Sequence, residues 1–330
     1  MLERVVISIT NRCNLHCIHC YANSGQEDSN TLTTTELERI VEQVARSSAQ
    51  YLIISGGEPM LTPDRLECVA INANKLGLKT ILTTNGTLID SHTAKWLKRL
   101  KIDTVQISLD SDRAEEHEFI RGKGTFRSAV NGIQTIVDNG LNCHIMMVAF
   151  KHNVERISSL AILSKELGVN LLAVDRFVPT GRGKFSDNLD LSKDELIKLH
   201  SQVLEIKNEK YIPISTNDPI CNAIYLKRMG LQNFDWAKDA NLGCTAGTRL
   251  CMISANGVVY PCTFINVPIG NIRENNLKDI LENSPLITAL KERDKFKGKC
   301  GNCNVRYICG GCRAHALSTY KDILEEDPCC

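Results

Sequence analysis

The sequence has no run of about 20 apolar residues, no excess of charge of either sign and no stretch of low complexity. Without such an apolar run we expect no membrane-spanning helix. Lysine and arginine number 39 and aspartate and glutamate 38, so the net charge of +1 favours neither nucleic acid nor an anionic membrane as a partner. The first residues also lack the apolar segment of a secretory signal peptide. We therefore expect a cytoplasmic protein.

Cysteine, in contrast, is abundant. The 330 residues include 15 cysteines, too few per residue for a small disulfide-stapled scaffold, and the cytosol keeps thiols reduced. Metal or redox chemistry is then the expected use of these thiols. Three of them stand together at Cys13, Cys17 and Cys20, and nine lie between Cys244 and Cys330. This distribution predicts one metal site near the start of the chain and a cysteine-rich module at its end.

Between these two groups, short apolar segments alternate with helical patterns. The segments of strand length are residues 4–10, 51–55, 79–83, 104–109, 142–150 and 170–177. The intervening helices are expected at residues 33–47, 62–77, 91–100, 125–139 and 154–168, with a capping box at Thr33 and Glu36 and an N-cap at Thr62. Strands that alternate with helices predict an α/β fold with a parallel sheet, and six such units fall short of the eight of a full barrel.

The first strand is followed at once by Cys13-x3-Cys17-x2-Cys20. In a sheet of this kind, function lies in the loops after the carboxyl ends of the strands. Three thiolates can hold three irons of a four-iron cluster and leave the fourth iron open to a ligand. On spacing alone, a zinc site completed by His16 or His19 remains an alternative.

The loops after the next two strands carry further signals, namely Gly56-Gly57-Glu58-Pro59 and Thr84-Asn85-Gly86. The three-cysteine motif followed by Gly-Gly-Glu-Pro, in this order, resembles the radical S-adenosylmethionine (SAM) superfamily. The resemblance implies a partial (β/α)6 barrel. It also implies a [4Fe-4S] cluster on the three N-terminal cysteines, whose open iron binds SAM.

The resemblance further implies a set of residues that bind SAM. Gly56 and Gly57 would let the backbone approach the methionine part of SAM closely, Ser108 would hydrogen-bond the ribose, and Arg121 would pair with the carboxylate. The adenine would be bordered by the strand end near Val174 and by Tyr21. The alternatives are a core tyrosine, a strand-end serine and a solvated arginine. The complete set is Tyr21, Gly56, Gly57, Glu58, Asn85, Ser108, Arg121 and Val174, and no catalytic side chain is assigned.

The C-terminal cysteines have a pattern of their own, Cys244-x12-Gly257-x4-Cys262 followed by Cys300-x2-Cys303-x5-Cys309-x2-Cys312 and Cys329. This pattern is similar to the SPASM extension of radical SAM enzymes, which binds two auxiliary [4Fe-4S] clusters. The resemblance implies that Cys244, Cys251, Cys262 and Cys312 hold the first auxiliary cluster, with Cys251 as the added fourth ligand. It assigns Cys300, Cys303, Cys309 and Cys329 to the second.

The pattern departs from the family at one point, because two residues rather than three separate Cys309 from Cys312. A pair of zinc ribbons is the alternative for the whole module. Cys330 is either a stray thiol or a substitute ligand. The isolated Cys68, Cys143 and Cys221 are expected to be small buried hydrophobic residues.

These observations predict a barrel over residues 1–185, a helical bridge over 186–240 and a SPASM domain over 241–330. The resemblance implies an enzyme with three [4Fe-4S] clusters that cleaves SAM reductively and abstracts hydrogen from its substrate. That substrate is either a peptide or protein, or a tetrapyrrole of the haem or haem d1 type, and the reductant is a flavodoxin or ferredoxin. The competing hypothesis is a non-catalytic iron–sulfur or zinc protein that transfers electrons or binds a partner.

Overall fold

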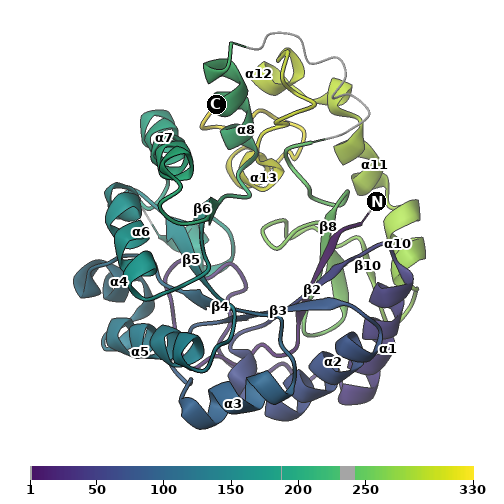
Figure 1. Cartoon of the computed structure of the whole chain (residues 1–330). Coiled ribbons are helices and arrows are strands. Elements are labelled where there is room, and N and C mark those ends of the chain that lie inside the picture. The colour runs from purple at the N-terminus through teal and green to yellow at the C-terminus, as the bar shows by residue number, and fades with distance from the viewer. Residues whose placement is uncertain (1, 187, 231–241) are drawn as a thin grey trace.

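The computed structural model describes residues 2–186, 188–230 and 242–330 (Figure 1). Its sheet has ten strands in the order β10-β9-β8-β1-β2-β3-β4-β5-β6-β7. The six expected strands are all present, as β1 (Arg4–Ser8), β2 (Tyr51–Ser55), β3 (Lys79–Thr84), β4 (Thr104–Ser108), β5 (Cys143–Ala149) and β6 (Leu171–Arg176). Each of them pairs in parallel with the next, which confirms the α/β fold.

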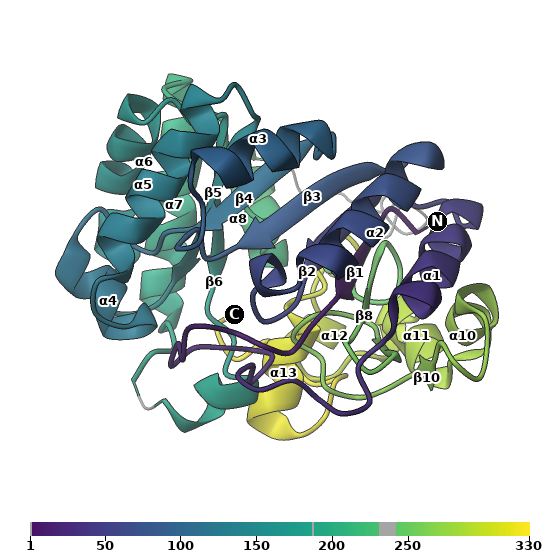
Figure 2. The same ribbon diagram turned by 90° about the horizontal axis from the view of Figure 1, so that it is seen from below.

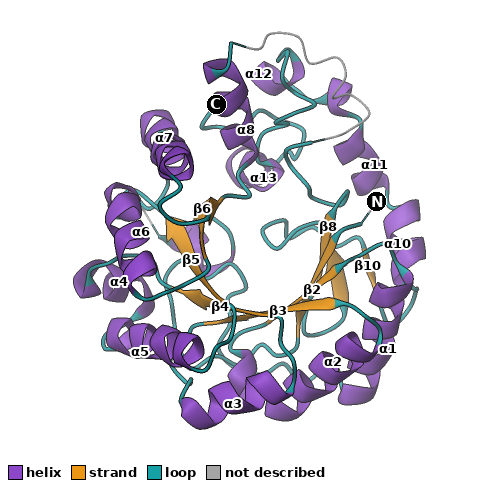
Figure 3. Cartoon of the chain, in the orientation of Figure 1, coloured by secondary structure: helices purple, strands orange, loops and turns teal. Residues whose placement is uncertain are grey.

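Helices follow these strands and cover one face of the curved sheet (Figure 3). They are α1 (Thr34–Arg46), α2 (Pro63–Lys75), α3 (Ser91–Arg99), α4 (Ala114–Arg121), α5 (Thr125–Asp138), α6 (Ile157–Glu166) and α7 (Lys193–Glu209). The capping box of Thr33 and Glu36 is formed. Thr62 is the N-cap of α2 and Pro63 its first residue, as predicted, although the Thr62 hydroxyl donates to the carbonyl of Pro59 and caps no helical N–H.

The main hydrophobic core lies between the sheet and these helices. Alternate strand residues such as Val5, Ile7, Leu52 and Ile54 are fully buried there, against helix residues such as Leu37. Because side chains alternate along a strand, the residues between them face the interior of the curved sheet.

The cysteine-rich segment does not form a separate sheet. Its strand β8 (Leu250–Ile253) pairs in parallel with β1, and β9 (Val258–Tyr260) and β10 (Gly270–Asn271) extend the sheet antiparallel. At the other edge the two-residue strand β7 (Ile214–Ser215) pairs with β6. The remaining described helices are α8 (Pro219–Arg228), α10 (Leu277–Asn283), α11 (Pro285–Lys291), α12 (Gly298–Gly301) and α13 (Arg313–Tyr320).

The sheet stays open between its two ends, and α8, α12 and α13 lie across the opening (Figure 1). In the perpendicular view the purple N-terminal loop and the yellow C-terminal segment lie on the same side of the molecule (Figure 2). The expected boundary at residue 240 falls outside the described residues. None of the described helices is long and apolar enough to cross a membrane.

Candidate functional site

The three N-terminal cysteines lie in the irregular loop that follows β1, at the carboxyl edge of the parallel strands. Burial, together with the nearby Glu58, Cys17 and Cys20, raises the pKa of Cys13 to about 11, against the opposing hydrogen bond from the N–H of Leu15. We looked among the described residues for three or more possible metal ligands whose ligand atoms all lie within 4.8 Å of one another. The sulfurs of Cys13, Cys17 and Cys20 do not form such a group. Zinc with bonds of about 2.3 Å needs sulfurs closer than that. The wider spacing suits the corners of a cubane cluster better than a single zinc ion.

The two glycines after β2 let the cysteine loop pack directly on the strand end. A Cβ added to Gly57 would lie 2.1 Å from the carbonyl oxygen of Arg12, and one on Gly56 would lie 2.6 Å from that of Thr10. The backbone N–H groups of Gly57 and Glu58 donate to those same two carbonyls, at 2.8 and 2.7 Å. The space left by the missing side chains is therefore filled by the loop that carries Cys13.

Glu58 and Asn85 connect the ends of β2 and β3 to that loop. The carboxylate of Glu58 is fully buried and accepts hydrogen bonds from the Thr84 hydroxyl and the Asn85 N–H, both at 2.8 Å. The side-chain amide of Asn85 donates to Asn14 at 2.9 Å. Burial raises the pKa of Glu58, and these hydrogen bonds oppose the rise. Both residues thus have positioning contacts behind the cysteine loop.

Arg121 is buried and not solvated. Its Nε donates to Asp110 at 2.6 Å and its Nη2 lies 3.4 Å from His19. Although burial opposes the charged forms, the mutual attraction holds the pKa of Asp110 at about 2 and raises that of Arg121. Arg121 also lowers the pKa of the neighbouring Cys17, against a larger opposite effect of burial. The pair places a fixed positive charge beside the thiols, and Asp110 was not predicted as its partner.

The other predicted SAM-binding residues divide into two groups. Ser108, at the end of β4, alternates with core residues and so faces the barrel interior. The hydroxyl of Tyr21 lies 3.5 Å from that of Ser55, and its ring meets the edge of Phe264 at 5.5 Å. The side chain of Val174, in contrast, is fully buried in the core on the helix side. The strand end near Val174 can therefore border the adenine through its backbone and not through this side chain.

The first auxiliary site has three cysteines that the structure brings together. Cys244, Cys262 and Cys312 pack against one small hydrophobic cluster, and Cys244 contributes to the raised pKa of both Cys262 and Cys312, after the larger effect of burial. Cys251 does not join them. It lies in β8 beside Val5 on the helix side of the sheet, and burial alone raises its pKa to about 12. Its prediction as the fourth ligand is wrong on this geometry.

At the second auxiliary site, the two adjacent thiols Cys329 and Cys330 lie in different surroundings. Burial raises the pKa of Cys330, and the neighbouring Cys300, Asp327 and Cys303 raise it further. Cys300 likewise contributes to the raised pKa of Cys309, after burial. Burial raises the pKa of Cys329 to about 12, and its thiol donates to the carbonyl of Leu191 at 3.1 Å. Cys330 thus lies near Cys300 and Cys303, whereas the sulfur of Cys329 points at Leu191.

The thiol of Cys329 lies in a different environment, among Asp190, Leu191 and His315. Asp190 Oδ2 lies 2.8 Å from Nε2 of His315, whereas the Cys329 sulfur lies 3.7 Å from Nδ1. Among the described residues, Asp190, His315 and Cys329 form a group of possible metal ligands whose ligand atoms all lie within 4.8 Å of one another. Because the carboxylate and the thiol meet different ring nitrogens, one metal ion cannot use all three ligands in this arrangement.

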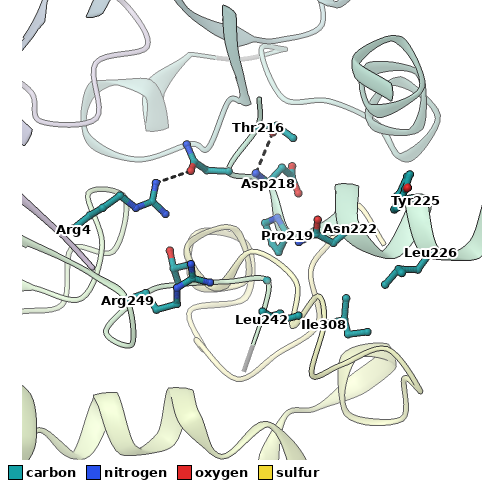
Figure 4. Close-up of a pocket in the computed structure, with 13 residues that line it drawn as sticks. Arg4, Thr216, Asp218, Pro219, Asn222, Tyr225, Leu226, Leu242, Arg249 and Ile308 are labelled. Carbon is teal, nitrogen blue, oxygen red and sulfur yellow. Dashed lines mark hydrogen bonds between the residues drawn. The ribbon is translucent and has the colours of Figure 1, made fainter. Parts of the chain in front are cut away.

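A cavity of about 360 Å³ lies in the opening of the sheet (Figure 4). Arg4 and Arg249 line one side and the α8 residues Asn222 and Tyr225 the other. Arg4 donates to Asn217 at 2.9 Å. Since Arg4 begins β1 and the cysteine loop follows the end of that strand, this cavity is separate from the proposed SAM site.

Comparison with known proteins identifies the families that the two parts of the chain resemble. Residues 7–162 match the family model of the radical SAM superfamily, and residues 244–304 match that of the SPASM iron–sulfur cluster-binding domain. The AdoMet-dependent heme synthase of Methanosarcina barkeri is 34% identical over 98% of this chain and 94% of its own length. The mycofactocin maturase MftC of Mycobacterium tuberculosis is 31% identical over 98% of this chain and 81% of its own.

Solved structures share the fold. The crystal structure of Streptococcus suis SuiB bound to its precursor peptide SuiA superimposes with a TM-score of 0.82 at 22% identity, over 99% of this chain and 75% of that one. The enzyme anSMEcpe with bound AdoMet gives a TM-score of 0.76 at 21% identity, over 99% of this chain and 94% of that one.

Proposed function

Because the chain belongs to the radical SAM superfamily and carries a SPASM iron–sulfur domain, we propose that it is a maturase whose substrate is an iron tetrapyrrole with propionate side chains. It is an enzyme that uses SAM and [4Fe-4S] clusters, one that binds SAM and others that are auxiliary. The tetrapyrrole is favoured by the relative at 34% identity, a heme synthase that this chain matches over nearly its full length.

The cofactors supply the difficult step: when bound, the N-terminal cluster delivers an electron that splits SAM into methionine and a 5′-deoxyadenosyl radical, which removes hydrogen from the substrate. The chain holds and orients these groups. Cys13, Cys17 and Cys20 would bind the cluster, and the Arg121–Asp110 pair would keep a cation beside it. The interior face of the barrel, with Ser108 among its residues, would receive SAM.

The auxiliary ligands follow from the contacts of the C-terminal module. We assign Cys244, Cys262 and Cys312 to one cluster, which leaves its fourth position for a group other than Cys251. Cys300, Cys303, Cys309 and Cys330 are assigned to the other. The chain would act in the cytoplasm with a flavodoxin or ferredoxin as electron donor, because all of these thiols must remain reduced to bind iron.

The reaction can be written with atoms and electrons balanced. Conversion of one propionate to a vinyl group releases one hydrogen atom, one carbon dioxide and one electron. The hydrogen atom would go to the 5′-deoxyadenosyl radical, and the cysteines of the C-terminal module would hold the auxiliary cluster that supplies an acceptor for the electron. Haem carries vinyl groups at two positions where Fe-coproporphyrin III carries propionates, so one haem requires two such events.

The test supplies the anaerobically reconstituted protein with SAM, dithionite and Fe-coproporphyrin III. We expect haem by mass spectrometry, with two 5′-deoxyadenosines for each haem. Formation of 5′-deoxyadenosine without any change in the tetrapyrrole would contradict the substrate. Peptide maturation is the second candidate, favoured by the 31% identity to MftC, and a short peptide encoded beside the gene would be the probe for it.

A further inference from the structure

The end of β6 carries an arginine that is buried between two carboxylates. Arg176 is 4% exposed, and its Nε lies 2.9 Å from Asp218, the residue that caps α8. Its other two nitrogens pair with both oxygens of Asp327 near the C-terminus, one of them at 3.1 Å. Asp218 also forms part of the wall of the cavity in Figure 4. One guanidinium thus joins the barrel, the bridging helix and the cysteine-rich module.

Asp327 is in turn bonded to residues of both auxiliary sites. Its Oδ2 accepts the N–H of Cys312 at 2.7 Å, and its own N–H points at the sulfur of Cys300 at 3.4 Å. Cys312 and Cys300 are assigned to different clusters. A single residue therefore contacts one ligand of each, Cys312 through its side chain and Cys300 through its backbone N–H, and Arg176 pairs with its side chain.

The positive charge of Arg176 also acts on the thiol of Cys312. Burial raises the pKa of Cys312, whereas Arg176 lowers it, and Asp327 and Asp218 raise it. A buried cation stabilises additional negative charge nearby because the interior screens charges weakly. A cluster gains one negative charge on reduction, and charge around a cluster is one of the factors that set its potential.

From these contacts we propose that Arg176 is a positioning residue for both auxiliary clusters, and that its charge raises the reduction potential of the cluster held by Cys244, Cys262 and Cys312. The proposal rests on the ligand assignment given under Proposed function. A higher potential suits this cluster to accept the electron left on the substrate. The negative charge of Asp218, on the other side of the guanidinium, lowers the reduction potential of the same cluster.

The test is a redox titration of the holoenzyme followed by electron paramagnetic resonance, using the auxiliary signal that SAM does not perturb. Arg176→Gln should lower its potential enough to change the ratio of reduced to oxidised cluster at least tenfold, or 59 mV for a one-electron couple. Arg176→Lys keeps the charge and should stay near the wild-type potential. Asp218→Asn should raise the potential, and asparagine preserves the helix cap.

Arg156→Gln is the matched control, because Arg156 forms a comparable ion pair with Asp112 at 3.0 Å and contacts no assigned ligand; it should shift nothing. Removing Arg176 leaves the buried Asp327 without its arginine and Asp218 with His200 as a remaining partner, so Arg176→Gln can fail to load iron. In that case Asp218→Asn decides: a raised potential supports the proposal, and an unchanged or lowered one overturns it. If Arg176→Gln loads iron and keeps the wild-type potential, the proposal is also overturned. The titration needs no substrate, so a wrong tetrapyrrole assignment leaves its outcome unaffected.

Discussion

Replacing Gly57 with alanine tests whether the Gly-Gly pair exists to seat the cysteine loop. The added methyl group would lie 2.1 Å from the carbonyl oxygen of Arg12 and 2.8 Å from that of Asn11. These atoms belong to backbone, which cannot rotate away as a flexible side chain can. The loop therefore has to move by about 1 Å or more to restore ordinary contacts.

The cost can be worked from the contacts that such a movement breaks. Overpacking costs about 1–3 kcal/mol. The hydrogen bonds from Gly57 and Glu58 to the loop contribute about 0.5–1.5 kcal/mol each. Gly57→Ala should thus lower the free energy of unfolding by about 2–6 kcal/mol and displace Cys13, which directly follows Arg12.

The assay combines urea unfolding with the yield of 5′-deoxyadenosine from SAM and dithionite. Gly57→Ala should unfold at lower urea and give less than one tenth of the wild-type yield, because a displaced Cys13 holds its iron poorly. Gly25→Ala is the matched control: Gly25 pairs with the same loop, yet a Cβ there meets no atom within 4 Å. If Gly57→Ala matched the wild type within a factor of two in yield and kept its stability, the packing argument would be refuted.

Three further results are expected. Cys330→Ser should lose about four of roughly twelve irons, at four per cluster, whereas Cys329→Ser should keep them all in an iron and sulfide assay; the reverse would restore Cys329 as the ligand. Burial lowers the pKa of His200, but Cys221 and Asp218, whose Oδ2 lies 3.4 Å from Nε2, outweigh it and raise that pKa to about 9. Protonation of His200 therefore stabilises the fold fully below about pH 6.5, and this contribution, at most about 3 kcal/mol, is lost as pH rises through 9. In urea unfolding, the free energy of unfolding of His200→Leu should fall less between pH 7 and 10 than that of the wild type. Cys303→Ala, when circular dichroism shows it folded, should still cleave SAM with dithionite, and Cys17→Ala should not; wild-type cleavage by Cys17→Ala would contradict the role of the N-terminal cluster.

The six central strands could be predicted because each is a short apolar segment between helical patterns, and burial of both faces leaves that signature in the sequence. The strands β7 to β10 have four residues or fewer, too few for any periodicity to appear. The eight-residue α4 was missed for a similar reason, since its buried side chains are His117, Ile120 and Arg121, of which two are polar.

The ligand predictions at Cys251 and Cys329 depended on short elements that leave no periodicity in the sequence. Unless β8 is recognised, nothing in the sequence shows that alternation turns Cys251 toward the helices. Cys329 and Cys330 are adjacent, and the choice between them depends on a turn in which the N–H of Cys330 donates to the carbonyl of Asp327. Spacing identifies the segment that supplies a ligand, whereas the local backbone decides which of two neighbouring thiols faces the cluster.

The two ends of the chain meet at an aromatic contact that spacing also could not reveal. Tyr21 directly follows Cys20, Phe264 lies two residues after Cys262, and their rings pack edge to face. The loop proposed to bind SAM and the loop assigned to the first auxiliary cluster are therefore held against each other, while Cys303 is assigned to the other auxiliary cluster. Loss of Cys303 leaves this contact in place, which is the physical reason to expect that SAM cleavage continues while transfer of the substrate's electron fails.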